Sequence, residues 1–344
     1  MRLPLVVLAA LARTAASYCC FYPETTRRCD NCQSIAEDSN YCAGSESKCV
    51  DECDHVWCDG AAADDGAAAA ATPVLPDGPE WQLGTYTTRY WDCCKPSCAW
   101  NGKGDVDRPV LACEAETGEI LTDANVASVC DGGTAASCAS NQPWTYNDGV
   151  SLGFAAAAVS GNHGLNGDEN CGQCYELVWS NEGGAHPDIV GKSHIIQVTN
   201  IGYDVTGDHS FDLQIPGGGQ GIFDTGCVRQ FPGGLFGGYS TDDFDCGVRY
   251  GGCADESGCS RLPSELRAGC EWRFSDSYRS DNPYVRFRRV RCPAELVEIS
   301  GSTPRDDDDW PALDLDAYAG GGLYSRALGR RPGFALALFL GGLM

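Results

Sequence analysis

The sequence TTRYWDCCKPSCAW, at residues 87–100, decides how the rest of this chain is interpreted. Within it Asp92 follows the aromatic pair Tyr90 and Trp91 and precedes the adjacent cysteines Cys93 and Cys94. A packed indole and two disulfides would hold this carboxylate rigidly, whereas most of the 48 acidic residues of the chain must be solvated surface charges. The stretch therefore indicates a rigid acidic site, of the kind that general acid–base catalysis requires.

The residues around this stretch, from position 81 to position 299, have a globular composition with little helical periodicity. Short runs between Gly- and Asp-rich turns predict strands at residues 174–179 (CYELVW), 193–199 (SHIIQVT) and 284–290 (YVRFRRV). The segment VSLGFAAAAV, at residues 150–159, is predicted to be a helix with Asn147 or Asp148 as its N-cap. The whole pattern predicts an all-β fold, a compact and loop-rich β-barrel with few short helices.

Twenty-two cysteines in 344 residues imply either disulfides in an oxidising compartment or a cluster of metal sites. The N-terminus favours disulfides, because Arg2 precedes an apolar run and small residues at positions 14–17 offer a cleavage point before Tyr18. We therefore expect a signal peptide over residues 1–17 and a secreted, extracellular protein. The five histidines show no metal-ligand spacing, so neither a metal nor a cofactor is expected.

The net charge of −24 argues against a nucleic-acid partner, because a polyanion would repel this chain. A neutral polysaccharide is compatible with that charge. No internal segment is long enough to span a membrane. At the C-terminus, small residues at 319–322, a polar spacer and the apolar run 334–344 follow in the order of a GPI-anchor signal. The alternative is a disordered end or an inaccurately assigned coding sequence, so membrane attachment is expected only if the tail is such a signal.

Three further segments flank the globular region, which is expected at residues 80–302. Residues 18–58 hold eight cysteines among aromatic residues, which indicates a small disulfide-stapled module. It is either a carbohydrate-binding module, whose exposed rings stack on sugars, or a stapled spacer whose aromatic residues form its core. Residues 59–79, rich in Ala, Asp, Gly and Pro, are predicted to be a linker, and residues 303–344 a disordered acidic tail.

The stretch at residues 87–100 resembles the signature of the glycoside hydrolase family 45 endoglucanases. The resemblance covers residues 84–299 and implies a six-stranded double-psi β-barrel with long disulfide-linked loops and few short helices. It recurs in order at the motifs Gln142-Pro143-Trp144, Leu152-Gly153-Phe154-Ala155-Ala156, Cys174-Tyr175-Glu176-Leu177, Phe211-Asp212-Leu213-Gln214-Ile215-Pro216-Gly217-Gly218-Gly219, Gly269-Cys270-Glu271-Trp272-Arg273-Phe274 and Arg291-Cys292-Pro293-Ala294-Glu295-Leu296.

This resemblance implies an endo-β-1,4-glucanase, a cellulase that hydrolyses internal β-1,4-glucosidic bonds with inversion. Inverting hydrolysis needs a carboxylic acid that protonates the leaving oxygen and a carboxylate that activates a water, roughly 6.5–9.5 Å apart. By position in the motifs, Asp92 is the general base and Asp212 the general acid. Asp204 is the counterpart of a third family aspartate, although it lies one residue further from Asp212 than the family spacing. Its charge would raise the pKa of the acid.

Four other residues are candidates for substrate binding. Tyr90 and Trp100 offer aromatic faces on which the apolar faces of pyranose rings stack, with core packing as the competing explanation. Lys95 and His209 are candidates for hydrogen bonds to sugar hydroxyls, although a lone histidine beside an aspartate is usually a surface residue. The expected partner is a β-glucan, cellulose or a related β-1,4-glycan, and the chain is expected to act as a monomer.

The resemblance also implies a set of disulfides. Two family cysteines that bond each other are absent together, where Gly172 and Ser302 stand, so no orphan thiol is left. A further pair of cysteines falls in what looks like an inserted loop and is expected to pair locally. The implied pairs are Cys93 with Cys227, Cys94 with Cys130, Cys98 with Cys171, Cys113 with Cys138, Cys174 with Cys292, Cys259 with Cys270, and, in the inserted loop, Cys246 with Cys253.

The main alternative is a non-hydrolytic protein of the expansin type, which has a similar barrel and loosens wall glycans. Expansins resemble this chain around Asp212 but lack the YWD base motif, which is complete here. A barwin-like or lectin-like protein that only binds glycans would have no evident use for both Asp92 and Asp212. The hydrolase is therefore the preferred interpretation, and release of reducing ends from a soluble glucan distinguishes the three.

Overall fold

A computed structural model describes residues 18–21, 34–35, 56–58, 73, 75–159, 161, 164–182, 184–205, 209–233 and 238–320 of the chain. The chain divides into two compact units, Met1–Ala70 and Ala71–Met344. The predicted signal peptide, most of the cysteine-rich module, most of the linker and the end of the C-terminal tail lie outside the described residues.

Three short strands are described in the first unit: β1 (Tyr18–Phe21), β2 (Ser34–Ile35) and β3 (Val56–Cys58). They form an antiparallel sheet in the order β2-β1-β3. The prediction that this module binds carbohydrate stays a prediction.

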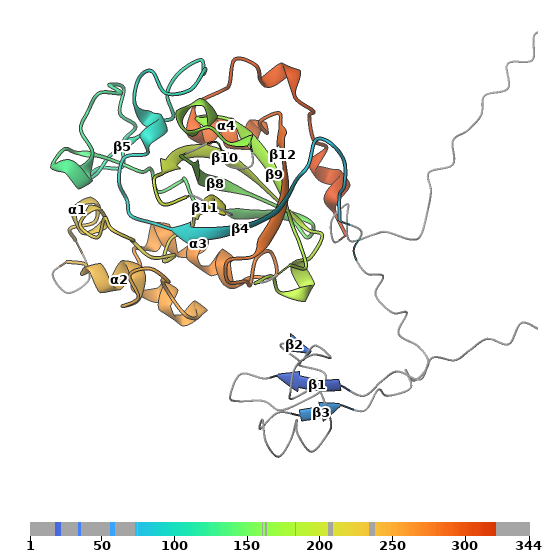
Figure 1. Cartoon of the computed structure of the whole chain (residues 1–344). Coiled ribbons are helices and arrows are strands. Elements are labelled where there is room, and N and C mark those ends of the chain that lie inside the picture. The colour runs from blue at the N-terminus through green and yellow to red at the C-terminus, as the bar shows by residue number, and fades with distance from the viewer. Residues whose placement is uncertain are drawn as a thin grey trace, which may run out of the picture. The chain divides into compact units, whose positions relative to one another are not determined.

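The second unit is built around six strands whose pairings form a ring. Neighbouring strands pair in the order β10-β9-β12-β4-β11-β8, and β8 pairs in turn with β10, so the series returns to its start (Figure 1). A seventh strand, β7 (Trp144–Asn147), pairs with one end of β8. The predicted all-β class is confirmed, and the double-psi assignment stays a prediction. The ring strands are β4 (Gln82–Tyr90), β8 (Val150–Ala158), β9 (Cys174–Trp179), β10 (Ser193–Gly202), β11 (His209–Gln214) and β12 (Tyr284–Val290).

The segment 150–159 was predicted to be a helix, but its residues 150–158 form strand β8 in the structure, so that prediction is wrong. Its run of alanines favours a helix, but all of its residues are buried and its backbone pairs with both β10 and β11. Gly153 shows how closely the neighbours approach, because a Cβ there would lie 2.9 Å from His194 and 3.2 Å from Pro143. Tertiary packing therefore overrides the local helix propensity of this segment.

The main hydrophobic core is formed by side chains of the ring strands. Val198 of β10, Phe211 of β11 and Phe287 of β12 are among them, and the rings of Phe211 and Phe287 meet edge to face at 4.9 Å. Full burial of one large apolar side chain stabilises a fold by roughly 1.5–3 kcal/mol. This core fixes the strand ends from which the site residues described below project.

Short helices and loops surround the ring, with a small two-stranded sheet of β5 (Cys113–Glu114) and β6 (Ala135–Ala136). In the part of the chain that the structure describes, none of the helices is long and apolar enough to cross a membrane. The α-helices are α1 (Gly226–Gln230), α2 (Thr241–Asp245), α3 (Ser264–Phe274) and α4 (Ala294–Ser300). The 3-10 helices are η4 (Ser97–Ala99), η5 (Val129–Asp131), η7 (Gly167–Asn170), η8 (Pro187–Ile189), η9 (Glu256–Arg261), η10 (Asp307–Asp309) and η11 (Leu315–Tyr318).

Seven disulfides join the loops of the second unit to one another and to the ring. Each restricts the unfolded chain and stabilises the fold by about 2–4 kcal/mol. Gly172 and Ser302, which stand where the family has a further pair, are neighbours here, since a Cβ on Gly172 would lie 3.3 Å from the Ser302 hydroxyl. The seven pairs are those named from the sequence: Cys93–Cys227, Cys94–Cys130, Cys98–Cys171, Cys113–Cys138, Cys174–Cys292, Cys246–Cys253 and Cys259–Cys270.

Residues 303–320 pack against the rest of the second unit, so the prediction that the chain becomes disordered at residue 303 is wrong for this part. Leu315 and Tyr318 are buried, and Tyr318 donates a hydrogen bond of 2.7 Å to the buried carboxylate of Glu176. The acidic run that suggested disorder is partly neutralised by arginines of the strand β12 region, as in the 2.9 Å ion pair between Asp306 and Arg289.

Candidate active site

Strands β4 and β11 bring together the two aspartates that the sequence singles out. These strands lie side by side and run parallel, with Asp212 of β11 opposite Thr88 of β4 (Figure 1). Asp92 lies two residues beyond the end of β4. The charge of Asp92 acts on the carboxyl of Asp212, so the two belong to one site although they are distant in the sequence.

The carboxyl of Asp212 is held by a chain of hydrogen bonds that begins at His209. Thr88 Oγ1 donates to Asp212 Oδ1 at 2.8 Å. His209 Nε2 lies 2.5 Å from Thr88 Oγ1 and 3.0 Å from the carbonyl oxygen of Phe211. Because a carbonyl oxygen can only accept, Nε2 carries the ring proton, and Thr88 turns its own proton toward Asp212. The His209 ring also stacks on Tyr86 at 5.0 Å, which fixes the start of this chain.

The carboxyl of Asp92 is held by the backbone that follows it. The N–H of Cys94 donates to Asp92 Oδ1 at 2.9 Å. Cys93 has a φ of 63°, a left-handed conformation that costs a non-glycine residue about 1–2 kcal/mol. Both cysteines are disulfide-bonded, which holds this turn in place. Gly226 packs against the same turn, since a Cβ there would lie 2.3 Å from the Asp92 carbonyl oxygen.

The two carboxyls differ in pKa. Burial, together with the charges of Asp204 and Asp92, raises the pKa of Asp212 to about 8, although the hydrogen bond from Thr88 opposes this rise. Burial raises the pKa of Asp92 only to about 6, because the N–H of Cys94 stabilises its charged form. Each side chain keeps a partly exposed surface. Near pH 7, Asp212 is therefore protonated and Asp92 is ionised.

Asp204 and Tyr90 complete the group. Asp204 is exposed, just after the end of β10, and its charge contributes to the raised pKa values of Asp92, Asp212 and Tyr90. Burial and the charges of Asp92 and Asp212 raise the pKa of Tyr90 well above its ordinary value, so its hydroxyl is neutral. That hydroxyl accepts a 3.2 Å hydrogen bond from Asn200. The three aspartates and Tyr90 thus act on one another electrostatically.

Two residues of this group were missed by sequence analysis. Thr88 carried a usable signal, because alternation along a strand places residues 88 and 90 on the same face. No comparable sequence signal points to Asn200, because its hydrogen-bond partners are distant in the sequence. On β10, Asn200 donates to Tyr90 and accepts a 2.9 Å hydrogen bond from the N–H of Ser97, so it ties Tyr90 to the loop after Asp92.

Lys95 and Trp100, both predicted to bind substrate, contact each other in the structure. Lys95 Nζ lies 3.2 Å from the centroid of the Trp100 ring and donates to the carbonyls of Ala124 and Val126, at 2.7 and 2.9 Å. Lys95 is buried, whereas Trp100 is half-buried. These contacts give Lys95 a structural part in holding the neighbouring loop, and the role of either residue in binding sugar stays a prediction.

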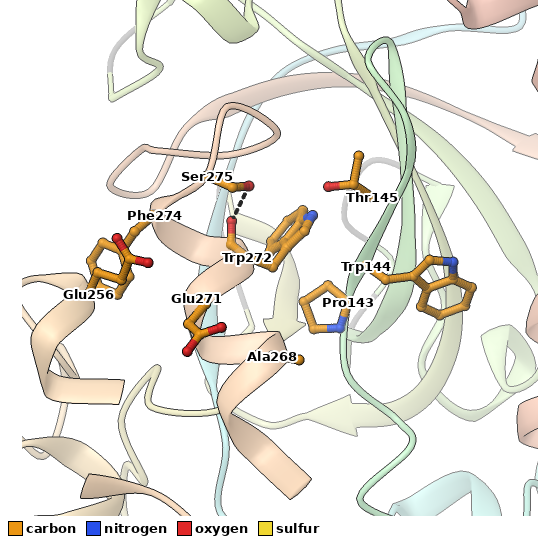
Figure 2. A pocket seen from close by; sticks show the side chains of 9 residues that line it. All are labelled: Pro143, Trp144, Thr145, Glu256, Ala268, Glu271, Trp272, Phe274 and Ser275. Atoms are coloured by element: carbon orange, nitrogen blue, oxygen red, sulfur yellow. Dashed lines mark hydrogen bonds between the residues drawn. The ribbon is translucent and has the colours of Figure 1, made fainter. Parts of the chain in front are cut away.

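A separate hollow of about 350 Å³ lies between helix α3 and the segment that leads into β7 (Figure 2). Pro143, Trp144 and Thr145 line one side, and residues of α3 such as Glu271 and Trp272 line the other. The three aspartates are not part of its lining, so it is distinct from the candidate active site. Among the residues that the structure describes, no group of three or more His, Cys, Asp or Glu side chains is arranged to hold a metal ion.

The paired aspartates can move protons in opposite directions. A protonated carboxyl can give a proton to a leaving oxygen, and an ionised carboxyl can take one from a water. When the surroundings of two carboxyls shift their pKa values apart, one site can supply both an acid and a base near neutral pH.

Comparison with known proteins identifies relatives that are described as endoglucanases. Residues 84–303 match the model of glycosyl hydrolase family 45. An endoglucanase of Cryptopygus antarcticus is 46% identical over 214 residues, which are 62% of this chain and 86% of that protein. An endoglucanase of Phaedon cochleariae is 39% identical over 240 residues, which are 68% of this chain and 90% of that protein.

A solved structure shares the fold. The crystal structure of the cellulase from the Antarctic springtail Cryptopygus antarcticus superposes with a TM-score of 0.53 at 42% sequence identity. The superposition covers 65% of this chain and 99% of that one. The family match, at residues 84–303, lies in the second unit, where the paired aspartates stand.

Proposed function

This chain belongs to glycosyl hydrolase family 45, and we propose that it cleaves β-glucan with Asp212 as the general acid and Asp92 as the general base. It is an endo-β-1,4-glucanase, a cellulase that hydrolyses internal β-1,4-glucosidic bonds. The non-hydrolytic, expansin-like alternative is set aside because the family is one of hydrolases. The assignment of roles is supported by the placement of both carboxyls in one site at β4 and β11, where surroundings raise the pKa of Asp212 to about 8 and that of Asp92 only to about 6.

The proposed reaction is a single displacement with inversion. Asp212 gives its proton to the glycosidic oxygen as the bond from the anomeric carbon to that oxygen breaks, and the bonding electrons leave with the oxygen. Asp92 takes a proton from a water whose oxygen attacks the anomeric carbon from the opposite face. The products are two shorter glucans, one with a new non-reducing end and one with a new reducing end of inverted configuration.

The neighbouring residues support these roles in the proposal. Asp204 keeps Asp212 protonated, because a nearby negative charge disfavours a second one. Thr88 orients the Asp212 carboxyl toward the leaving oxygen. Tyr90 and Trp100 are proposed to stack on sugar rings. Lys95 and His209 have most of their polar atoms engaged within the protein, and we propose that their remaining hydrogen-bonding groups contact sugar hydroxyls.

The experiment that tests this proposal is hydrolysis of carboxymethylcellulose and barley β-glucan by the full-length chain, with reducing ends and the anomer of the first product measured. Asp92→Asn and Asp212→Asn should each lose at least about two orders of magnitude in kcat. Asp242→Asn, at an exposed aspartate of α2, is the matched control and should keep full activity. Retention of configuration, or full activity in either site variant, would contradict the proposal.

We also propose that the enzyme is secreted and acts outside the cell, as a monomer, on a neutral glucan. Seven disulfides in the described residues support this, because such bonds persist in oxidising compartments. Within that proposal the cysteine-rich first unit binds carbohydrate and keeps the enzyme near insoluble substrate. Binding of the full-length chain to cellulose, compared with a chain that starts at residue 73, tests the role of the first unit.

A further inference from the structure

The side chain of Arg89 lies inside the protein although it carries a charge. Arg89 is near the end of β4, opposite Leu213 of β11, and only 8% of its side chain is exposed. Removing a guanidinium from water is costly unless hydrogen bonds replace those that it loses. The proposed acid–base chemistry of Asp92 and Asp212 gives this residue no part, so its burial needs another explanation.

The guanidinium of Arg89 joins two loops to β4. Its Nη1 donates to the side-chain oxygens of Asp281 and Asn282, the latter at 3.0 Å, and its Nη2 donates to the carbonyl of Gly251 at 2.8 Å. The charge of Asp281 contributes little by itself, because that side chain is 77% exposed. What the guanidinium supplies is geometry, since its planar fork holds several acceptors at fixed angles.

The first of these loops, residues 246–253, lies directly over the Pro-Gly-Gly-Gly turn that follows the acid strand β11. A disulfide between its two ends closes this loop. The N–H of Cys253 donates to the carbonyl of Gly217, in the turn, at 2.9 Å. Gly252 packs so closely that a Cβ there would lie 1.9 Å from the same carbonyl oxygen. The loop and the turn are therefore in direct backbone contact, and the position of one sets the position of the other.

The turn links the segment of the proposed base to the strand of the proposed acid. At its end, the carbonyl of Gly219 accepts a 2.8 Å hydrogen bond from the N–H of Trp91, the residue before the base. At its start, the N–H of Ile215, three residues after Asp212, donates to the carbonyl of Tyr90 at 2.9 Å. A shift of the turn would therefore change the distance between the two carboxyls.

The charge of Arg89 also reaches the proposed acid. Burial is the largest of the influences that raise the pKa of Asp212, and the positive charge of Arg89 opposes them. Removing that charge would therefore raise this pKa further. The other charged or titratable groups around Arg89 and Asp212 are Asp92, Asp204, Tyr90, His209, Arg273, Tyr278 and Asp281.

We propose that Arg89 is a positioning residue for the reaction: by fastening loop 246–253 to β4, its guanidinium holds the turn that sets Asp212 against Asp92. This inference rests on the proposed function, because it matters only if these carboxyls are the acid and the base. Arg89 acts through the loop and the turn and not by contact with the reacting atoms. Inversion depends on the separation of the two carboxyls, and a displacement of about 1 Å can slow a reaction about a hundredfold.

The test compares Arg89→Met and Arg89→Lys with Arg108→Met, at an arginine whose side chain is 65% exposed. On barley β-glucan, Arg89→Met should lower kcat about thirtyfold and leave KM within about twofold, because the carboxyls move while the sugar contacts remain. The alkaline limb of its kcat/KM profile should lie at higher pH than in the parent, because the acid loses a favourable charge.

The lysine variant separates the geometry of Arg89 from its charge. Arg89→Lys should lower kcat about tenfold, because an ammonium group cannot hold both loops, but should keep the alkaline limb of the parent. Arg108→Met should match the parent in kcat and in both limbs. Each kcat is referred to folded protein, measured by circular dichroism, so that a loss of stability is not counted as a loss of catalysis.

Two outcomes would overturn the inference. One is an Arg89→Met variant with a lowered urea midpoint but the parent's kcat per folded molecule and the parent's alkaline limb, which would make Arg89 a support of the fold alone. The other is a parent-like kcat in Arg89→Lys, which also decides the matter if Arg89→Met does not fold. Failure of the proposed function is distinguishable, since it would appear as full activity in Asp92→Asn or Asp212→Asn, whatever the effect at Arg89.

Discussion

Asp92 and Asp212 are the same residue type held in opposite protonation states, and their surroundings account for the difference. Burial and the charge of Asp204 raise the pKa of both carboxyls, but the backbone N–H of Cys94 limits the rise at Asp92, whereas the charge of Asp92 adds to the rise at Asp212. Sequence analysis pointed to both aspartates through their motifs. It could not find Asn200, because that contact depends on how β10 and the loop after β4 meet in space.

These two pKa values predict the pH dependence of catalysis. Below pH 6 Asp92 becomes protonated and can no longer take a proton, and above pH 8 Asp212 becomes ionised and can no longer give one. The profile of kcat/KM on soluble β-glucan should therefore be bell-shaped, with limbs near pH 6 and pH 8 and a maximum near pH 7. A flat profile between pH 5 and pH 9 would contradict this account of the two carboxyls.

Thr88 should set the alkaline limb of that profile. Its hydroxyl stabilises the charged form of Asp212, so Thr88→Val should raise the pKa of the acid and move the alkaline limb up by about 0.5–1 pH unit. We also expect kcat to fall about tenfold, because the carboxyl loses an orienting contact. Thr88→Ser keeps the hydroxyl, so the alkaline limb of this variant should lie at the same pH as in the parent. An unmoved limb in Thr88→Val would show that the hydroxyl does not act on Asp212.

At the scale of the element, the sequence predicted strands well where apolar side chains alternate or run together. Residues 174–179 and 284–290 were predicted as strands and are β9 and β12 with the same bounds. Strand β8 was mistaken for a helix because alanines favour helices locally. What makes it a strand is its pairing with β10 and β11, and those partners lie too far along the chain for local propensity to show them.

Close packing around β8 gives a prediction at this scale. Gly153→Ala should lower the free energy of unfolding by about 1–3 kcal/mol, because the added methyl would meet the His194 ring and Pro143. Gly233→Ala is the matched control, since no atom lies within 4 Å of a Cβ built there. Urea denaturation of both variants measures the difference. Equal urea midpoints for the two variants would show that β8 accommodates the added methyl group, which would contradict the packing described here.

In the molecule as a whole, residues 303–320 pack against the rest of the second unit instead of forming a tail. The acidic run of this segment suggested disorder, because charge runs usually lie in solvent. The deciding residues come later, where Leu315 and Tyr318 are buried and Tyr318 bonds the carboxylate of Glu176. A few apolar anchors among polar residues give too weak a sequence signal to predict such docking.

The docking of this segment predicts a stability effect. Tyr318→Phe removes a hydrogen bond to a buried carboxylate, and we expect the free energy of unfolding to fall by about 1–2 kcal/mol. Glu176 keeps its bonds from Ser193 and Arg288, which limits the loss. Tyr203→Phe, at a tyrosine that is 88% exposed and lies outside this segment, should change the free energy of unfolding by less than about 0.5 kcal/mol. If both variants unfold at the parent's urea concentration, the segment does not contribute as described.

A comparison of two leaving groups separates the role of Asp212 as general acid from the role of Asp92 as general base. A 2,4-dinitrophenyl cello-oligosaccharide has a leaving group that needs no proton, whereas a natural glucan needs one. Asp212→Asn should therefore regain most of the parent rate on the activated substrate while remaining at least about a hundredfold slower on glucan. Asp92→Asn should remain slow on both, because the attacking water still lacks its base. Recovery in Asp92→Asn instead of Asp212→Asn would contradict the assignment and exchange the two roles.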